Sequence, residues 1–182
     1  MAGVTILATA RQHAAGIAAM QIASWPIEFE GIVPPARLAH FDLASREQMV
    51  ARFLSAPPSD DPISGSLVGL DDDTVVGRVV FGRTPDEDLL PAAVGEVSSI
   101  GVHPDRWRQG IGSALLTAAE RHMADAGAER SVLWVLEGNE RARHFYEAHG
   151  WVPDGSRRTH RGGPPPLFGV EVPELRYWRG LT

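Results

Sequence analysis

The chain has 182 residues, of which 43% are hydrophobic and 22% are charged, which predicts a single domain spanning residues 1–182 with its own core. Cysteine is absent, and so is lysine, because all 17 basic residues are arginine. These absences exclude a disulfide, a cysteine nucleophile, a Schiff-base lysine and a Walker-type phosphate-binding lysine within this chain. The net charge of −6 disfavours a nucleic-acid partner, because such binders neutralise phosphates with a basic surface.

The first residues, MAGVTILATARQ, lack the basic segment and long apolar core of a signal peptide. No stretch of the sequence approaches the roughly 20 apolar residues of a membrane span. We therefore expect a cytoplasmic protein with no membrane partner.

The first third of the chain is predicted to contain a strand and two helices. Residues 4–8 are short, β-branched and apolar, as in a strand, and residues 9–25 carry apolar side chains at helical spacing. Residues 29–42 contain two adjacent prolines and are predicted to be a loop with at most a short helix. A second helix is expected over residues 45–54. Its expected inward-facing residues are Met49, Phe53 and Leu54.

The middle of the chain is predicted to form antiparallel strands. Residues 66–70 and 74–82 are apolar runs divided by three aspartates, which indicates a hairpin. The aspartates are interpreted as a solvated turn, because no calcium-loop spacing follows them. After a polar loop, residues 94–102 are predicted to be a third strand.

The last part of the chain alternates helices and strands. Residues 110–126 place their apolar side chains on one stripe of a helix, and residues 139–149 form a second helix between an asparagine cap and a glycine. Residues 131–136 and 170–178 are predicted strands, and the basic, proline-rich residues 157–166 a loop. The resulting order is β-α-α-β-β-β-α-β-α-β, which predicts an α/β (α+β) fold with a mixed sheet and helices on both faces.

One glycine-bearing segment carries the clearest chemical signal. A strand leads through His103 and a short polar loop to Arg108-Gln109-Gly110-Ile111-Gly112 at the start of a helix. Glycines at a helix N-terminus leave backbone N–H groups unobstructed, and the helix dipole favours an anion such as a pyrophosphate there. Glycines that only permit a tight loop are the alternative interpretation.

A second segment follows the strand SVLWVL, and its residues keep a regular spacing. They are Asn139, Ala142, Phe145, Tyr146, Gly150 and Trp151. Together the two segments resemble the GNAT N-acetyltransferase superfamily, with its motifs Arg/Gln-x-x-Gly-x-Gly/Ala and Asn-x-x-Ala-x-x-Phe-Tyr-x-x-x-Gly-Phe/Trp. The resemblance is strong over residues 96–155 and weaker upstream. Trp107 departs from it, because it occupies the Arg/Gln position.

This resemblance implies a mostly antiparallel, twisted sheet and the use of acetyl-CoA as a co-substrate. The implied acetyl-CoA-binding residues are Ile100, Gly101, Val102, Arg108, Gln109, Gly110, Ile111, Gly112, Ser113 and Asn139. The implied substrate-binding residues are Trp25, Glu28 and Phe29. No metal site is expected, because the seven histidines lack metal-ligand spacing.

The implied reaction is direct acetyl transfer to a primary amine of a small molecule or peptide in a ternary complex. An amine with a pKa of about 10 is protonated at neutral pH, so a general base is needed, and the departing thiolate needs an acid. Tyr146 occupies the family's acid position, although it is also compatible with a core tyrosine. Glu96 is the candidate base, with a surface carboxylate as the alternative. Its rivals are Glu28, Glu30, Glu171 and Glu174.

Two further possibilities remain open at this stage. A non-catalytic acyl-CoA-binding sensor or regulatory module would share the glycine segment, whereas Tyr146 and Glu96 favour an enzyme. A homodimer is possible, because the apolar last strand, residues 170–178, offers an edge that another subunit could cover.

Overall fold

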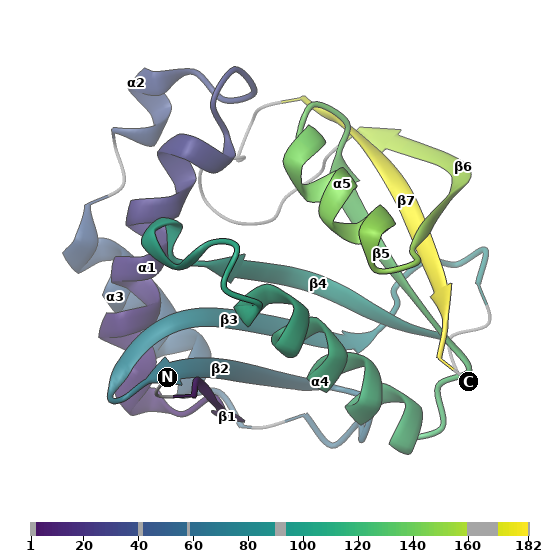
Figure 1. Cartoon of the computed structure of the whole chain (residues 1–182), viewed down its shortest axis with the longest axis horizontal. Coiled ribbons are helices and arrows are strands. Elements are labelled where there is room, and N and C mark those ends of the chain that lie inside the picture. Colours follow the sequence, from purple (N-terminus) through teal and green to yellow (C-terminus); the bar gives the residue numbers. More distant parts are fainter. Residues whose placement is uncertain (1–2, 40–41, 58, 90–93, 160–170, 182) are drawn as a thin grey trace.

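The computed structural model describes residues 3–39, 42–57, 59–89, 94–159 and 171–181. Within these residues one sheet is flanked by helices (Figure 1). The strands are β1 (Thr5–Ala8), β2 (Gly65–Asp71), β3 (Thr74–Arg83), β4 (Val94–Val102), β5 (Arg130–Leu136), β6 (Val152–Thr159) and β7 (Pro173–Gly180). The α-helices are α1 (Ala14–Glu28), α2 (Pro35–Leu38), α3 (Leu43–Leu54), α4 (Ile111–Asp125) and α5 (Glu140–Ala148).

The strands follow the order β1-β2-β3-β4-β5-β7-β6, and neighbours are antiparallel except for the parallel pair β4 and β5. This parallel pairing is short. It joins Val94–Glu96 to Arg130–Val132 and goes no further. Within the described part of the chain, β4 pairs only with β3 beyond Glu96, so the two central strands diverge and leave a gap at the carboxyl end of β4.

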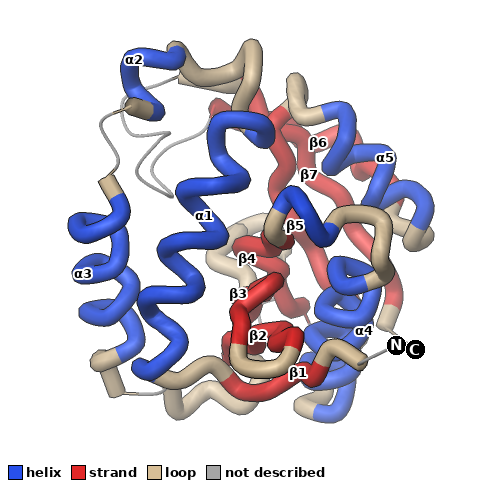
Figure 2. Tube along the Cα trace, turned by 60° about the vertical axis from the view of Figure 1, so that its left-hand side comes forward, coloured by secondary structure: helices blue, strands red, loops and turns tan. Residues whose placement is uncertain are grey.

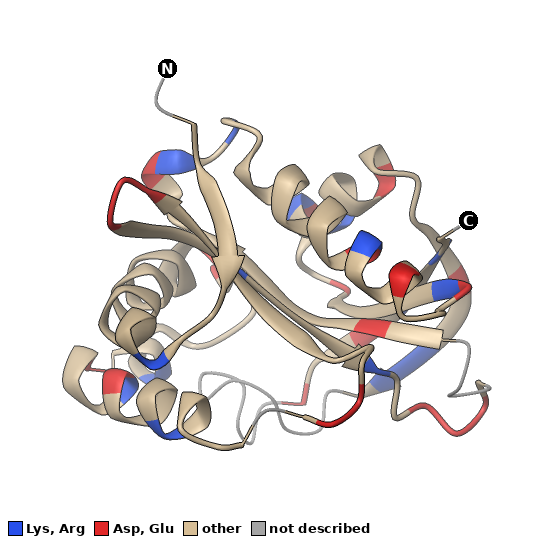
Figure 3. Ribbon diagram, turned by 90° about the horizontal axis from the view of Figure 1, so that it is seen from below, with Lys and Arg blue, Asp and Glu red and all other residues tan. Residues whose placement is uncertain are grey.

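Helices cover both faces of the sheet. Figure 3 shows the sheet edge-on between α1 and α3 on one side and the helices of the second half of the chain on the other. The face of α4 that carries Leu115, Leu116 and Met123 is fully buried against β3, β4 and β5. On the opposite face Ile17 of α1 and Val50 of α3 pack on β2 and β3, and the two helices lie side by side (Figure 2).

Local signals set the ends of the two helices nearest the gap. Gly110 precedes α4 with a φ of 80°, and Gly127 follows it with a φ of 93°, both in the left-handed region that glycine adopts without strain. Asn139 caps α5, because its side-chain oxygen accepts a hydrogen bond of 3.1 Å from the Ala142 N–H. These positions agree with the predicted helices.

The predicted fold class is confirmed, with three local corrections. Residues 152–159 form strand β6, so the expected loop over residues 157–166 is wrong for the part that the structure describes, Arg157–Thr159. The helix α3 begins at Leu43 with Asp42 as its cap, earlier than expected. Met49 and Phe53 are 46% and 58% exposed and do not face inward.

The last strand also differs from the prediction, because β7 pairs with β5 on one side and β6 on the other. It is therefore an interior strand, and its backbone offers no free edge for a second subunit. Among the described residues, no helix is long and apolar enough to cross a membrane, and no cluster of three or more potential metal ligands occurs.

Candidate active site

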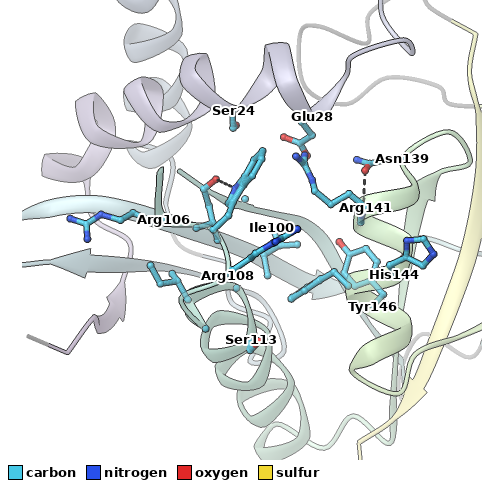
Figure 4. Close-up of a pocket in the computed structure, with 18 residues that line it drawn as sticks. Ser24, Glu28, Ile100, Arg106, Arg108, Ser113, Asn139, Arg141, His144 and Tyr146 are labelled. Atoms are coloured by element: carbon cyan, nitrogen blue, oxygen red, sulfur yellow. Dashed lines mark hydrogen bonds between the residues drawn. The ribbon is translucent and has the colours of Figure 1, made fainter. Parts of the chain in front are cut away.

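A cavity of about 570 Å³ occupies the gap where β4 and β5 diverge (Figure 4). Its walls come from the end of α1, the last residues of β4, the start of α4 and the first turns of α5. The lining residues are Ser24, Glu28, Ile100, Gly101, Val102, Arg106, Trp107, Arg108, Gly110, Ile111, Gly112, Ser113, Asn139, Arg141, Ala142, His144, Phe145 and Tyr146. Segments far apart in the chain thus meet in one site.

The N-terminus of α4 forms a wall of the cavity that is suited to an anion. Both Arg108 and Gly110 have a left-handed backbone, with φ values of 60° and 80°, which turns the chain sharply into the helix. The N–H groups of the first helical turn have no acceptor within the helix, and the dipole places positive potential beside them. Gly112 and Phe145 both line the cavity, and a Cβ atom on Gly112 would lie 3.4 Å from the Phe145 ring, so a larger side chain there would fill space beside that ring.

A histidine fixes the hydroxyl of Ser113 at the same wall. The Nδ1 atom of His149 lies 2.7 Å from the carbonyl oxygen of Phe145, and its Nε2 atom lies 2.8 Å from Ser113 Oγ. Because a carbonyl only accepts, Nδ1 carries the proton in the neutral ring and Nε2 accepts the hydrogen bond from Ser113. The lone pairs of Ser113 Oγ are thereby left available at the start of α4.

Trp107 and Arg141 connect two walls of the cavity. The indole Nε1 of Trp107 donates a hydrogen bond of 2.8 Å to the Val102 carbonyl, so its polar atom is used within the protein. The Arg141 guanidinium lies over the same ring, 3.8 Å from its centroid. Arg141 was not among the predicted site residues, although it lies one helical turn before the motif residue Phe145 and thus on the same face of α5.

Glu28 and Tyr146 both line the cavity, and the charge of Glu28 acts on the Tyr146 phenol. Glu28 lies in the last turn of α1, and Arg141 reaches toward it from α5 (Figure 4). Burial raises the pKa of Glu28 to about 7, against the opposing effect of Arg141. Glu28 makes no hydrogen bond or ion pair within 4 Å with any other described residue, so its carboxylate is available to a ligand.

Tyr146 is a buried tyrosine, 8% exposed, whose ring packs between Phe145 and Trp151. Burial raises the pKa of its phenol, and the negative charge of Glu28 raises it further. The hydroxyl forms no hydrogen bond within the described part of the chain. Tyr146 therefore stays protonated at neutral pH and presents an O–H group to the cavity.

The structure brings together most of the predicted site residues, but four of them do not line the cavity. Gln109 donates from its side chain to the Asp105 carbonyl, 3.2 Å away. Trp25 and Phe29 are each 5% exposed and pack with other apolar residues beneath the end of α1. They support the position of Glu28 and offer little surface to a ligand.

Glu96 is the fourth of these residues. Its carboxylate accepts a hydrogen bond of 3.3 Å from the Thr84 hydroxyl, and burial and the neighbouring Asp86 raise its pKa. It pairs with Val132 at the point where β4 and β5 are still joined. The cavity begins further along β4, where the two strands have separated, so Glu96 does not line it.

The family model for the acetyltransferase (GNAT) family matches residues 29–151, which include most of this site. The chain therefore belongs to the GNAT acetyltransferase family, as its two motifs predicted. An uncharacterized N-acetyltransferase of Mycobacterium tuberculosis is 30% identical over 159 residues, which cover 87% of this chain and 96% of that protein.

Other relatives match over shorter regions. The mycothiol acetyltransferase of Propionibacterium freudenreichii is 40% identical over 91 residues, which are 50% of this chain and 28% of that protein. The match thus spans less than a third of that relative's length.

Solved structures support the fold. PaiA N-acetyltransferase of Thermoplasma acidophilum, solved in complex with coenzyme A, has a TM-score of 0.66 at 15% identity, covering 98% of this chain and 99% of that one. A GNAT-family acetyltransferase of Streptococcus pneumoniae has a TM-score of 0.64 at 18% identity, covering 99% of this chain and 100% of that one. At these identities the similarity concerns the fold alone.

Proposed function

We propose that this protein transfers an acetyl group from acetyl-CoA to a primary amine of a small molecule or peptide, by direct attack in a ternary complex. The observation that carries the proposal is the cavity itself. It combines a helix N-terminus suited to an anion with a carboxylate and a phenol that make no hydrogen bonds to any described residue.

Acetyl-CoA is the donor that the GNAT family uses, and the chain offers groups for each of its parts. The N–H groups at the start of α4 and the hydroxyl of Ser113 would hold the diphosphate. Beyond Glu96 the β5-facing edge of β4 has no partner strand among the described residues, so the backbone of Ile100–Val102 is available to the amide groups of the pantetheine arm. The thioester would then lie between β4 and α5, near Tyr146.

Glu28 is the general base in this proposal, in place of Glu96. With a pKa of about 7 it is partly ionised at neutral pH and basic enough to take a proton from the acceptor ammonium, directly or through water. The free amine attacks the thioester carbon and forms the new C–N bond. The C–S bond then breaks, and the Tyr146 phenol protonates the departing thiolate of CoA. The new amide nitrogen releases its extra proton, which restores the phenol.

The absence of cysteine supports direct transfer, because the chain has no thiol to form an acyl-enzyme thioester. A sensor that only binds acyl-CoA would use the same wall of α4 but would not need Glu28 and Tyr146. Turnover separates the two functions. We therefore expect thiol release from acetyl-CoA with at least one member of an amine panel, measured with a thiol-reactive chromophore.

Acetyl-CoA is expected to stabilise the protein before any acceptor is known. The free energy of unfolding should rise as RT ln(1 + [L]/Kd), or by about 2.7 kcal/mol at a concentration of 100 Kd. A thermal-shift titration measures this effect, with acetylated pantetheine, which lacks the diphosphate, as the control. Absence of a shift at millimolar acetyl-CoA with folded protein would refute both the enzyme and the sensor.

Replacing Gly112 with valine should weaken acetyl-CoA binding by at least about tenfold and leave the fold intact. The added side chain would project beside Phe145 into the space where the ligand meets the helix backbone. Thr117→Val, an exposed position later on α4, is the matched control for helix propensity. Isothermal titration calorimetry compares the two variants, and equal affinities would show that Gly112 has only a structural role.

A further inference from the structure

Two buried arginines lie on the sheet face opposite α4, outside the cavity. Arg78 of β3 and Arg46 of α3 are both 8% exposed, and burial and the charge of Arg46 lower the pKa of Arg78. Arg78 pairs in the sheet with Val68, which is buried against α1 and α3, so its side chain lies on the same side. A cationic pair thus lies beneath the two N-terminal helices.

Neither guanidinium has a carboxylate partner. Arg78 Nε donates to Ser66 Oγ at 3.2 Å, and Arg46 donates to Gln21 Oε1 at 2.8 Å and to Met49 Sδ at 3.1 Å. The Phe53 and Trp25 rings face the two guanidinium groups. Among the described residues all these partners are neutral, and all 23 acidic side chains of the chain are described.

One nitrogen of this pair has no hydrogen-bond partner among the described residues. Arg78 Nη2 is fully buried and makes no hydrogen bond. Burying a charged group costs several kcal/mol unless an opposite charge and hydrogen bonds compensate it. Burial and Arg46 lower the pKa of Arg78 to about 10, so the guanidinium still carries its charge at neutral pH.

We propose that Arg78 and Arg46 form a binding site for the anionic group of a small ligand, a carboxylate or a phosphate. Such a group accepts two parallel hydrogen bonds from a guanidinium and supplies the missing negative charge. Phe53, which covers the Arg78 guanidinium, is 58% exposed, and exposed side chains change rotamer within nanoseconds, which gives a route of entry.

The site adjoins the candidate active site. Arg78 is the register partner of Gly101, which lines the cavity, and neighbouring strands lie about 5 Å apart. The anion can therefore be carried by the acceptor amine, or it can be a free anion. That the acceptor amine carries the anion rests on the proposed function, whereas the binding of an anion by Arg78 and Arg46 does not.

The first experiment measures anion binding without turnover. Inorganic phosphate and acetate are titrated at constant ionic strength while Tm is recorded for the full chain. We expect a saturable rise in Tm that is retained in Gly112→Val, which alters the other anion-binding wall. In Arg78→Met the apparent affinity should fall at least about tenfold, in line with the loss of a charge-assisted hydrogen bond.

A purely structural role for Arg78 predicts a different result. Arg78→Met would then lower Tm in anion-free buffer and leave the anion response unchanged. Our proposal predicts an equal or higher Tm, because an unpaired buried charge is removed and volume is kept. Arg52→Met, an exposed position on α3, controls for the loss of a positive charge, and Arg46→Met provides a second test if Arg78→Met does not fold.

The second experiment identifies the source of the anion. It compares kcat/KM for phenylalanine and 2-phenylethylamine, which differ only in the carboxylate. A preference of at least about tenfold for the amino acid that disappears in Arg78→Met assigns the anion to the acceptor. Equal values with retained phosphate or acetate binding assign it to a free anion. No anion response in the first experiment overturns the proposal, whereas no acetylation of any amine overturns only the proposed function.

Discussion

Replacing Glu28 with glutamine is expected to reduce turnover by about 100- to 10,000-fold, the usual contribution of a general base. The amide has nearly the same shape as the carboxylate, but it cannot accept a proton from the acceptor ammonium. Acetyl-CoA affinity should change little, because Glu28 lies across the cavity from the start of α4. Steady-state thiol release and calorimetric binding of acetyl-CoA measure the two effects separately.

The pH dependence provides an independent check of this assignment. A base acts when it is ionised, so kcat/KM of the wild type should rise with pH and level off above about 7, the pKa to which burial raises Glu28. In Glu28→Gln the plateau should be lost, and the lower residual rate should keep rising with pH, because it depends on the small fraction of acceptor that is free amine. Above pH 7 the folded protein also bears the cost of an ionised, buried Glu28, so the variant should have a higher Tm than the wild type at pH 8.

Glu96→Gln is the matched control, since it makes the same chemical change in a second partly buried carboxylate. We expect a much smaller effect on turnover, because Glu96 bonds to Thr84 and lies outside the cavity. The reverse order, with Glu96→Gln the more damaging variant, would return the role of base to Glu96.

Replacing Tyr146 with phenylalanine should lower turnover by about 10- to 1,000-fold with almost unchanged acetyl-CoA affinity. The substitution removes the proton donor and keeps the ring that packs against Phe145 and Trp151. Because the phenol makes no hydrogen bond within the described residues, Tm should stay near the wild-type value. A core tyrosine would show no loss of turnover at all.

The leaving group offers a sharper test of Tyr146. A thioester with a more acidic thiol releases a thiolate that needs less help from an acid, so the defect of Tyr146→Phe should shrink with such a donor. The ratio of wild-type to variant kcat for the two donors measures this effect. An unchanged ratio would separate Tyr146 from protonation of the thiolate.

The glycine segment and the helices around it could be predicted from the sequence because they depend on neighbouring residues. The left-handed turn at Gly110, the apolar stripe of α4 and the Asn139 cap are each set within a few positions. The family motifs lie in the same contiguous segments. The chain thus reveals its class and one wall of its site without tertiary information.

Strand β6 shows why local pattern failed elsewhere. Most of its side chains are exposed, and prolines and glycines flank its basic residues, so no alternating apolar pattern marks it. It is a strand because its backbone pairs with β7 at the edge of the sheet. The same pairing places β7 in the interior of the sheet.

The sequence by itself indicated the family and two candidate catalytic groups, the Tyr146 phenol and a carboxylate, and it favoured Glu96 over its rivals for the carboxylate. Only the tertiary structure shows which of these carboxylates line the cavity. The pairing of β4 with β5 ends at Glu96, and the end of α1 lies over the gap beyond it, so Glu28 enters the cavity while Glu96 stays outside. Tertiary packing also buries Arg46 and Arg78 without an acidic partner, since the charge around a side chain depends on which distant elements pack against it.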